Sequence, residues 1–120
     1  MILIGGKNAG VRVMRGSNQV LREIVKRIVE AEHPERIVLF GSRARGTARP
    51  DSDFDLLVIK RSTQPRYRRS AHLYTILADL PVEVEIMVYT PDETAEWKAV
   101  PEAFVTTAIR EGKVLYERQG

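Results

Sequence analysis

Hydrophobic positions recur with a helical period along residues 17–32. The apolar members of this repeat are Val20, Leu21, Ile24, Val25, Ile28 and Val29. Charged side chains fill the positions between them, and Pro34 follows the last turn. A period near 3.6 residues, stopped by a proline, predicts an amphipathic helix over 17–32.

Four short apolar runs predict β-strands, at Arg36–Phe40, Phe54–Lys60, Val82–Tyr89 and Val114–Tyr116. The third run alternates strictly. One of its faces carries Val82, Val84, Ile86 and Val88, and the other carries Glu83, Glu85, Met87 and Tyr89. This alternation predicts a strand with one buried face and one face that carries carboxylates.

Helices are predicted between these strands. A helix start near Ser62–Pro65 leads into a helix over Tyr67–Leu80, which Pro81 ends. Thr90-Pro91-Asp92-Glu93 has the residues of a capping box with proline at the first helical position. Pro101 is expected to open a last helix that Gly112 closes.

Strands that alternate with helices place the chain in the α/β (or α+β) class. We expect a small mixed β-sheet with helices mainly on one face. At 120 residues the chain suits a single domain. We assign that domain to residues 17–120, and residues 1–16 to an N-terminal arm or a hairpin.

Composition excludes several classes of protein. The chain has no cysteine, which excludes a disulfide scaffold, a zinc ribbon and thiol catalysis. No apolar run approaches the ~20 residues of a membrane-spanning helix, and no export signal is evident. We therefore expect a cytoplasmic protein without a membrane partner.

Positive charge is concentrated in one stretch of the sequence. Residues 36–69 hold nine Lys or Arg against three Asp, whereas the whole chain has a net charge of only +3. A concentration of this kind favours an anionic partner such as a phosphate or a nucleic acid, although it also fits a solvated surface.

The residues with the clearest chemistry lie inside this stretch. Gly41 and Ser42 end a predicted strand, where glycine lets the backbone approach a ligand and serine offers its hydroxyl and amide to an oxyanion. Asp53 and Asp55 begin the next strand two residues apart. Period-two geometry aims both side chains at one face, with Cα atoms ~6–7 Å apart.

Carboxylates held this close repel one another unless a cation lies between them. Oxygen donors without nearby His or Cys suit Mg²⁺, or alternatively Mn²⁺. Glu83 and Glu85 share one face of Val82–Tyr89, so one of them would join the two aspartates if that strand is their neighbour. Three carboxylates beside a Gly-Ser turn are typical of two-metal phosphoryl or nucleotidyl transfer.

Gly41-Ser42, followed after ten residues by Asp53-x-Asp55, resembles the signature of the DNA polymerase β-like nucleotidyltransferase superfamily. Three further segments are similar to its smallest members, the minimal nucleotidyltransferases, typically encoded beside a HEPN-domain protein. These segments are Ala44-Arg45-Gly46, Ser52-Asp53-Phe54-Asp55-Leu56 and Val88-Tyr89-Thr90-Pro91. The resemblance covers residues 20–117 and implies a polymerase β-like nucleotidyltransferase fold.

The resemblance also implies roles for individual residues. Gly41 and Ser42 would hold the β- and γ-phosphates of ATP or another nucleoside triphosphate. Two Mg²⁺ ions would bind to Asp53, Asp55 and the family's third carboxylate, which aligns with Glu85; the family usually has Asp there. We expect Arg45 and Arg49 to neutralise charge on the triphosphate.

The function that follows is transfer of AMP from ATP to a hydroxyl, with a HEPN toxin as the acceptor and this chain as its antitoxin. One alternative is a non-catalytic module that neutralises a partner by binding it. Another is an antibiotic-type transferase for small molecules. Nucleic acid is not expected as a partner because no helix-turn-helix pattern is evident, and a homo-oligomer remains open.

Overall fold

The computed structural model describes residues 17–49, 52–98, 100 and 103–119, so the expectation for residues 1–16 lies outside the described part. Its helices are α1 (Ser17–Glu32), α2 (Ser42–Arg45), α3 (Arg66–Arg69), α4 (Ala71–Leu77), α5 (Pro91–Trp97) and α6 (Phe104–Glu111). Its strands are β1 (Arg36–Phe40), β2 (Phe54–Ile59), β3 (Val84–Tyr89) and β4 (Lys113–Glu117).

The strands form one mixed sheet in the order β3-β2-β1-β4. β1 runs antiparallel to both β2 and β4, whereas β2 and β3 are parallel. Parallel neighbours need a crossover, and α3 and α4 supply it between β2 and β3. The predicted α/β class with a mixed sheet is confirmed.

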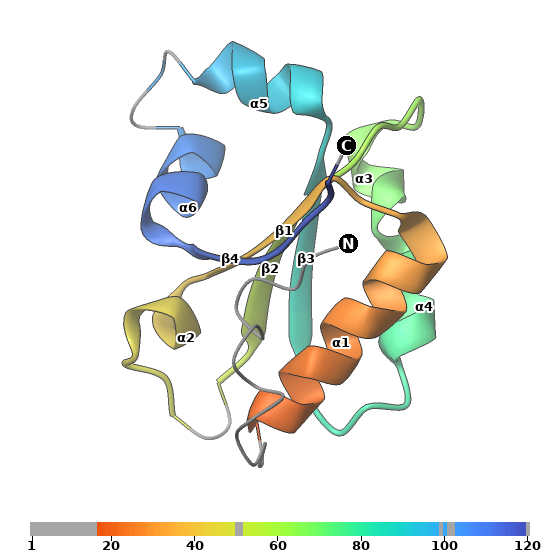
Figure 1. The fold of residues 1–120 in the computed structure, drawn as a ribbon, viewed down its shortest axis with the longest axis vertical. Helices are drawn as coiled ribbons and strands as arrows, with labels where there is room; N and C mark the ends of the chain where they lie inside the picture. Colours follow the sequence, from red (N-terminus) through yellow and green to blue (C-terminus); the bar gives the residue numbers. More distant parts are fainter. Residues whose placement is uncertain (1–16, 50–51, 99, 101–102, 120) are drawn as a thin grey trace.

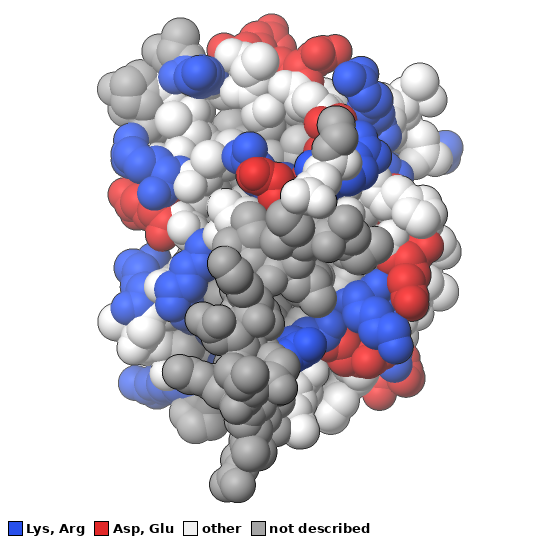
Figure 2. Space-filling model, viewed as in Figure 1, with Lys and Arg blue, Asp and Glu red and all other residues white. Residues whose placement is uncertain are grey.

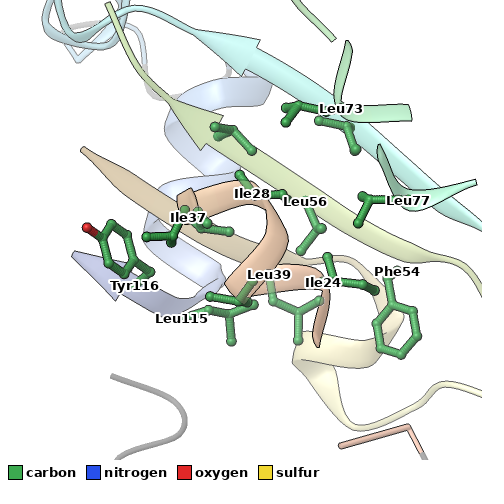
Figure 3. Close-up of a cluster of buried hydrophobic side chains, with 14 of the residues drawn as sticks. Ile24, Ile28, Ile37, Leu39, Phe54, Leu56, Leu73, Leu77, Leu115 and Tyr116 are labelled. Carbon is green, nitrogen blue, oxygen red and sulfur yellow. The ribbon is translucent and has the colours of Figure 1, made fainter. Parts of the chain in front are cut away.

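Helices cover both faces of the sheet unequally (Figure 1). The larger core lies between the sheet and the helices α1 and α4, and Ile24, Ile28, Leu56, Leu73 and Leu77 meet there (Figure 3). A smaller core lies on the opposite face beneath α6. Its buried members are Val38, Leu57, Ile59, Tyr89, Val105 and Ala108.

The helix predicted over Tyr67–Leu80 and the start of the third strand differ from the observed elements. The helix expected over Tyr67–Leu80 is two helices, α3 and α4. Ser70, with φ −90° and ψ −9°, separates the two helices. Its N–H donates to the carbonyl of Arg68 instead of the carbonyl four residues earlier, so the α-helical hydrogen-bond pattern is interrupted there. β3 begins at Val84 instead of Val82, because Val84 is the first residue of this segment that pairs with β2, opposite Phe54.

The helix boundaries near the C-terminal half follow the sequence more closely. Thr90 caps α5: its hydroxyl accepts the N–H of Glu93, whose carboxylate accepts the N–H of Thr90. This is the predicted capping box, with Pro91 at the first helical position. The last helix begins at Phe104, later than Pro101 suggested, and Gly112 follows its end.

Folding disperses the charge that is concentrated in the sequence. Five of the nine basic residues within 36–69 form ion pairs with glutamates from other segments. The pairs are Arg36–Glu117, Lys60–Glu32, Arg61–Glu35, Arg66–Glu93 and Arg69–Glu93. On the face shown in Figure 2, basic and acidic side chains are interspersed. This arrangement does not resemble the continuous basic surface of a nucleic-acid-binding protein.

Candidate active site

Three acidic residues share one face at the beginning of β2 and β3. Asp55 is the register partner of Glu85 on the parallel neighbour strand. In-register partners point to the same face. Asp53 precedes β2, and it is close enough for its charge to act on the Asp55 carboxyl. Two residues further along each strand, Leu57 and Met87 pack in the smaller core. The structure therefore brings together the three carboxylates that the sequence singled out.

The electrostatics of Asp55 reflect this grouping. Burial raises the pKa of the half-buried Asp55, and the negative charges of Asp53 and Glu85 raise it further. The positive charge of Arg45 acts in the opposite direction. Asp53 and Glu85 are exposed. The site therefore has an excess of negative charge that a bound cation would relieve.

The turn at Gly41 lies directly against Asp55. Gly41 has φ +74° and ψ −157°, and a Cβ built on it would be 2.3 Å from Oδ2 of Asp55. This backbone conformation is essentially confined to glycine. The Gly41 carbonyl accepts the N–H groups of Ala44 and Arg45, both at 3.1 Å, which forms the first turn of α2. Glycine at this position lets the turn and the carboxylate share the space.

Arg45 and Arg49, the predicted phosphate ligands, occupy different surroundings. Both side chains are exposed. Arg45 is close enough to influence the Asp55 carboxyl. The backbone of Arg49 contacts Ser52: its N–H donates to the Ser52 hydroxyl at 2.9 Å, and its carbonyl accepts the Ser52 N–H at 3.0 Å. These two bonds join Arg49 to Ser52, the residue directly before Asp53.

Arg43 is a site residue that sequence reasoning missed. Its Nε and Nη2 donate to the Ser52 carbonyl at 3.0 and 2.7 Å, and its guanidinium lies 4.0 Å from the centroid of the Phe54 ring. The sequence gives a weak signal at best, because an arginine in a loop rich in arginine resembles a solvated one. Only the fold shows that this side chain spans the residues on both sides of Asp53.

The arginine-rich segment of α3 is not an open anion site as a whole. Arg69 is only 8% exposed and binds Glu93 and the Val88 carbonyl. Arg66 lies 4.4 Å from the centroid of the Tyr89 ring. Tyr67, in contrast, is 81% exposed. His72 lies on the surface, where its Nδ1 is 2.7 Å from a Glu32 oxygen, away from the three carboxylates.

The donor set fits a hard divalent cation by its chemistry. Carboxylate oxygens are the ligands that Mg²⁺ and Mn²⁺ prefer. Within the described ranges, no group of three acidic, histidine or cysteine side chains forms a preformed metal site. The carboxylate side chains would therefore have to adjust on binding, which exposed Asp53 and Glu85 are free to do.

Comparison with known proteins places the chain in a family. The model of the nucleotidyltransferase domain family matches residues 19–114. The chain belongs to that family. This confirms the resemblance that the Gly-Ser and Asp-x-Asp residues indicated, and the matched range spans α1 through the start of β4. A comparison with curated proteins finds no significant match.

Solved structures support the fold of this nucleotidyltransferase domain. A Sulfolobus solfataricus protein described as a nucleotidyltransferase has a TM-score of 0.59 at 19% identity, over 83% of this chain and 79% of that one. A toxin–antitoxin structure with AMP-PNP has a TM-score of 0.52 at 24% identity, over 81% of this chain and 73% of that one. At these identities the likeness concerns the fold.

The helices were also compared with the requirements of a membrane span. Across the residues that the structure describes, no helix has both the length and the apolar character needed to cross a bilayer.

Proposed function

We propose that this domain is a Mg²⁺-dependent nucleotidyltransferase that moves AMP from ATP to a hydroxyl of a partner protein. One observation carries the proposal: Asp55 and Glu85 are register partners beside Asp53, and the Gly41 turn lies against the Asp55 carboxylate. The Gly-Ser turn, to which we assign phosphate binding, is therefore adjacent to the carboxylates in the fold. This combination serves nucleotidyl transfer.

The residues divide into two groups by the part of the substrate they would bind. Gly41 and Ser42 would hold the β- and γ-phosphates, and Arg45 would neutralise part of their charge. Asp53, Asp55 and Glu85 would hold two divalent ions. When bound, such ions stabilise charge on the phosphates and lower the pKa of the attacking hydroxyl.

The transfer itself is an in-line substitution at the α-phosphorus. The acceptor oxygen forms a bond to this phosphorus while the bond to the oxygen that bridges towards the β-phosphate breaks, and pyrophosphate leaves. The proton of the acceptor hydroxyl passes to Glu85, whose carboxylate is exposed. Gly41, Ser42 and Arg45 keep the leaving pyrophosphate in place.

We further propose that the acceptor belongs to a HEPN-domain toxin and that this chain acts as its antitoxin in the cytoplasm, where ATP is available. The resemblance to minimal nucleotidyltransferases supports this assignment. A structural neighbour is a toxin–antitoxin system with AMP-PNP, an ATP analogue, and this agrees with ATP as the donor.

Intact-mass spectrometry tests the proposal. The chain, ATP and Mg²⁺ are incubated with a HEPN-domain protein as the proposed partner, and the partner is weighed. We expect the partner to gain the mass of one AMP moiety with the wild type and no mass with the Asp53→Asn, Asp55→Asn double variant. An unchanged mass with the wild type, or an adduct that survives the double substitution, contradicts the proposal.

A non-catalytic binding module is a second candidate, and one observation favours it. Trp97, Val100 and Phe104 leave 40%, 38% and 44% of their surface exposed in and between α5 and α6. Exposed apolar residues of this kind can serve protein–protein contact. If binding alone neutralises the toxin, the double aspartate variant still protects cells from it; loss of protection excludes this candidate.

A further inference from the structure

Asp53 lies just outside the sheet, so contacts other than strand pairing must set its orientation. β2 begins at Phe54, whose N–H donates to the Glu83 carbonyl at 3.0 Å. The register pairs between β2 and β3 also begin at Phe54. Asp53 precedes this first pair and is exposed. Unlike Asp55, it is not fixed by strand pairing.

Both neighbours of Asp53 are bound by the same side chain. The Ser52 carbonyl accepts two hydrogen bonds from Arg43, from Nε at 3.0 Å and from Nη2 at 2.7 Å. The guanidinium also lies 4.0 Å from the centroid of the Phe54 ring, and Phe54 is only 1% exposed within the larger core. Arg43 thus connects the peptide before Asp53 to a fixed ring after it.

Arg43 also connects this peptide to the Gly-Ser turn. It is the second residue of α2, directly after Ser42, and α2 begins at the turn that lies against Asp55. A planar guanidinium can direct two N–H groups at one carbonyl while its face covers a ring. The ammonium of a lysine cannot make that combination of contacts.

We infer that Arg43 is a positioning residue, which holds Asp53 in place relative to Asp55 and to the Gly41–Ser42 turn. This inference rests on the proposed function, because it assigns Arg43 to the binding of the divalent ions without direct contact. Groups that orient metal ligands typically change metal affinity about 10- to 100-fold when they are removed.

The first test measures Mn²⁺ binding by electron paramagnetic resonance titration without nucleotide. The variants are Arg43→Gln and Arg43→Lys, and Arg110→Gln is the control because Arg110 is an exposed arginine that pairs only weakly with its neighbour Glu111. We expect the Mn²⁺ dissociation constant to rise about tenfold in both Arg43 variants and to stay at the wild-type value in the control. Wild-type affinity in Arg43→Gln, or full recovery in Arg43→Lys, overturns the inference.

A second measurement separates positioning from general loss of structure. The amide order parameter of Asp53, measured by NMR relaxation, should fall in the Arg43 variants while those of β1 residues such as Val38 stay unchanged. If Arg43→Gln does not fold, Arg43→Lys carries the test, since it keeps the charge and most of the aliphatic chain. A rigid Asp53 amide in a folded variant overturns the inference.

The outcomes distinguish this inference from the proposed function. Wild-type protein that binds Mn²⁺ no better than the Asp53→Asn, Asp55→Asn variant removes the proposed metal site, and the inference with it. Wild-type protein that binds Mn²⁺, together with an Arg43→Gln variant that binds it equally well, leaves the proposed function standing and removes only the role of Arg43.

Discussion

Substitution of Gly41 by alanine is expected to damage the site more than the fold. The added Cβ would lie 2.3 Å from Oδ2 of Asp55, so the carboxylate or the turn would have to move by about 1 Å to reach the 3.4 Å of ordinary contact. The backbone at φ +74° and ψ −157° adds a strain of about 1–3 kcal/mol. For a domain of this size that strain lowers Tm by roughly 4–12 °C.

Gly46 provides a matched control within the same loop. It also has a positive φ, of +77°, but a Cβ there meets nothing within 4 Å. Gly46→Ala should therefore lower the stability of the fold by about 1–2 kcal/mol through backbone strain, without displacing a carboxylate. The two variants are similar in strain and differ in their contact with Asp55.

The assay is AMP transfer to the partner protein under single-turnover conditions, well below the Tm of each variant. We expect Gly41→Ala to lose about 100-fold or more in rate, because a displacement near 1 Å at a reacting centre costs about that much. Gly46→Ala should stay within a few-fold of wild type. Equal rates for the two variants would refute the claim that Gly41 is required by the close approach of Asp55.

Substitutions at three further positions have distinct expected outcomes. Glu85→Gln should lose about 10²–10⁴-fold in transfer rate, while Glu85→Asp should keep most of the rate. Without metal, Glu85→Gln should also have a higher Tm, because like charges at facing positions of a sheet lower its stability by roughly 0.2–1 kcal/mol. The hydrogen bond from Arg69 holds the pKa of Glu93 below its ordinary value. The Arg69–Glu93 pair therefore stabilises the fold at pH values above the ordinary carboxyl pKa. This stabilisation is lost as the pH falls through the lowered pKa of Glu93. Denaturation curves should show Glu93→Gln about 1–2 kcal/mol less stable at pH 7 and equal to wild type in acid; a pH-independent difference would contradict this. Tyr74→Phe should lower the free energy of unfolding by about 1 kcal/mol in denaturation curves, because the Tyr74 hydroxyl accepts the N–H of Ile86 on the edge strand β3 at 2.8 Å. The same substitution should leave the transfer rate unchanged.

Periodicity predicted most elements because local signals and packing agree there. The helix over 17–32 buries Ile24 and Ile28 completely. The alternation in Val82–Tyr89 directs Ile86 and Val88 into the larger core, while the opposite face carries Glu85 and, further along, Met87 and Tyr89 of the smaller core. The same alternation predicted that Glu83 or Glu85 would lie beside the two aspartates if their strands were neighbours. Family resemblance then favoured Glu85 over Glu83, and the register with Asp55 agrees.

Tertiary contacts account for what the sequence did not reveal. The break at Ser70 has no proline or glycine to mark it, so a continuous helix was the natural prediction. The arginines of α3 belong to the basic stretch 36–69, which favoured an anionic partner, but Glu93, distant in sequence, binds Arg69. The position of the Arg43 guanidinium depends on how the loop before Asp53 folds back on α2.

Paramagnetic broadening by Mn²⁺ in two-dimensional amide NMR spectra tests the central claim most directly. With Mn²⁺ and a non-hydrolysable ATP analogue, the account predicts broadening centred on the amides of Gly41, Asp53, Asp55 and Glu85. The amide of Glu93, which lies in α5 after the C-terminal end of β3, should keep its intensity. Broadening centred on any other part of the chain, or the same pattern in the Asp53→Asn, Asp55→Asn variant, would contradict it.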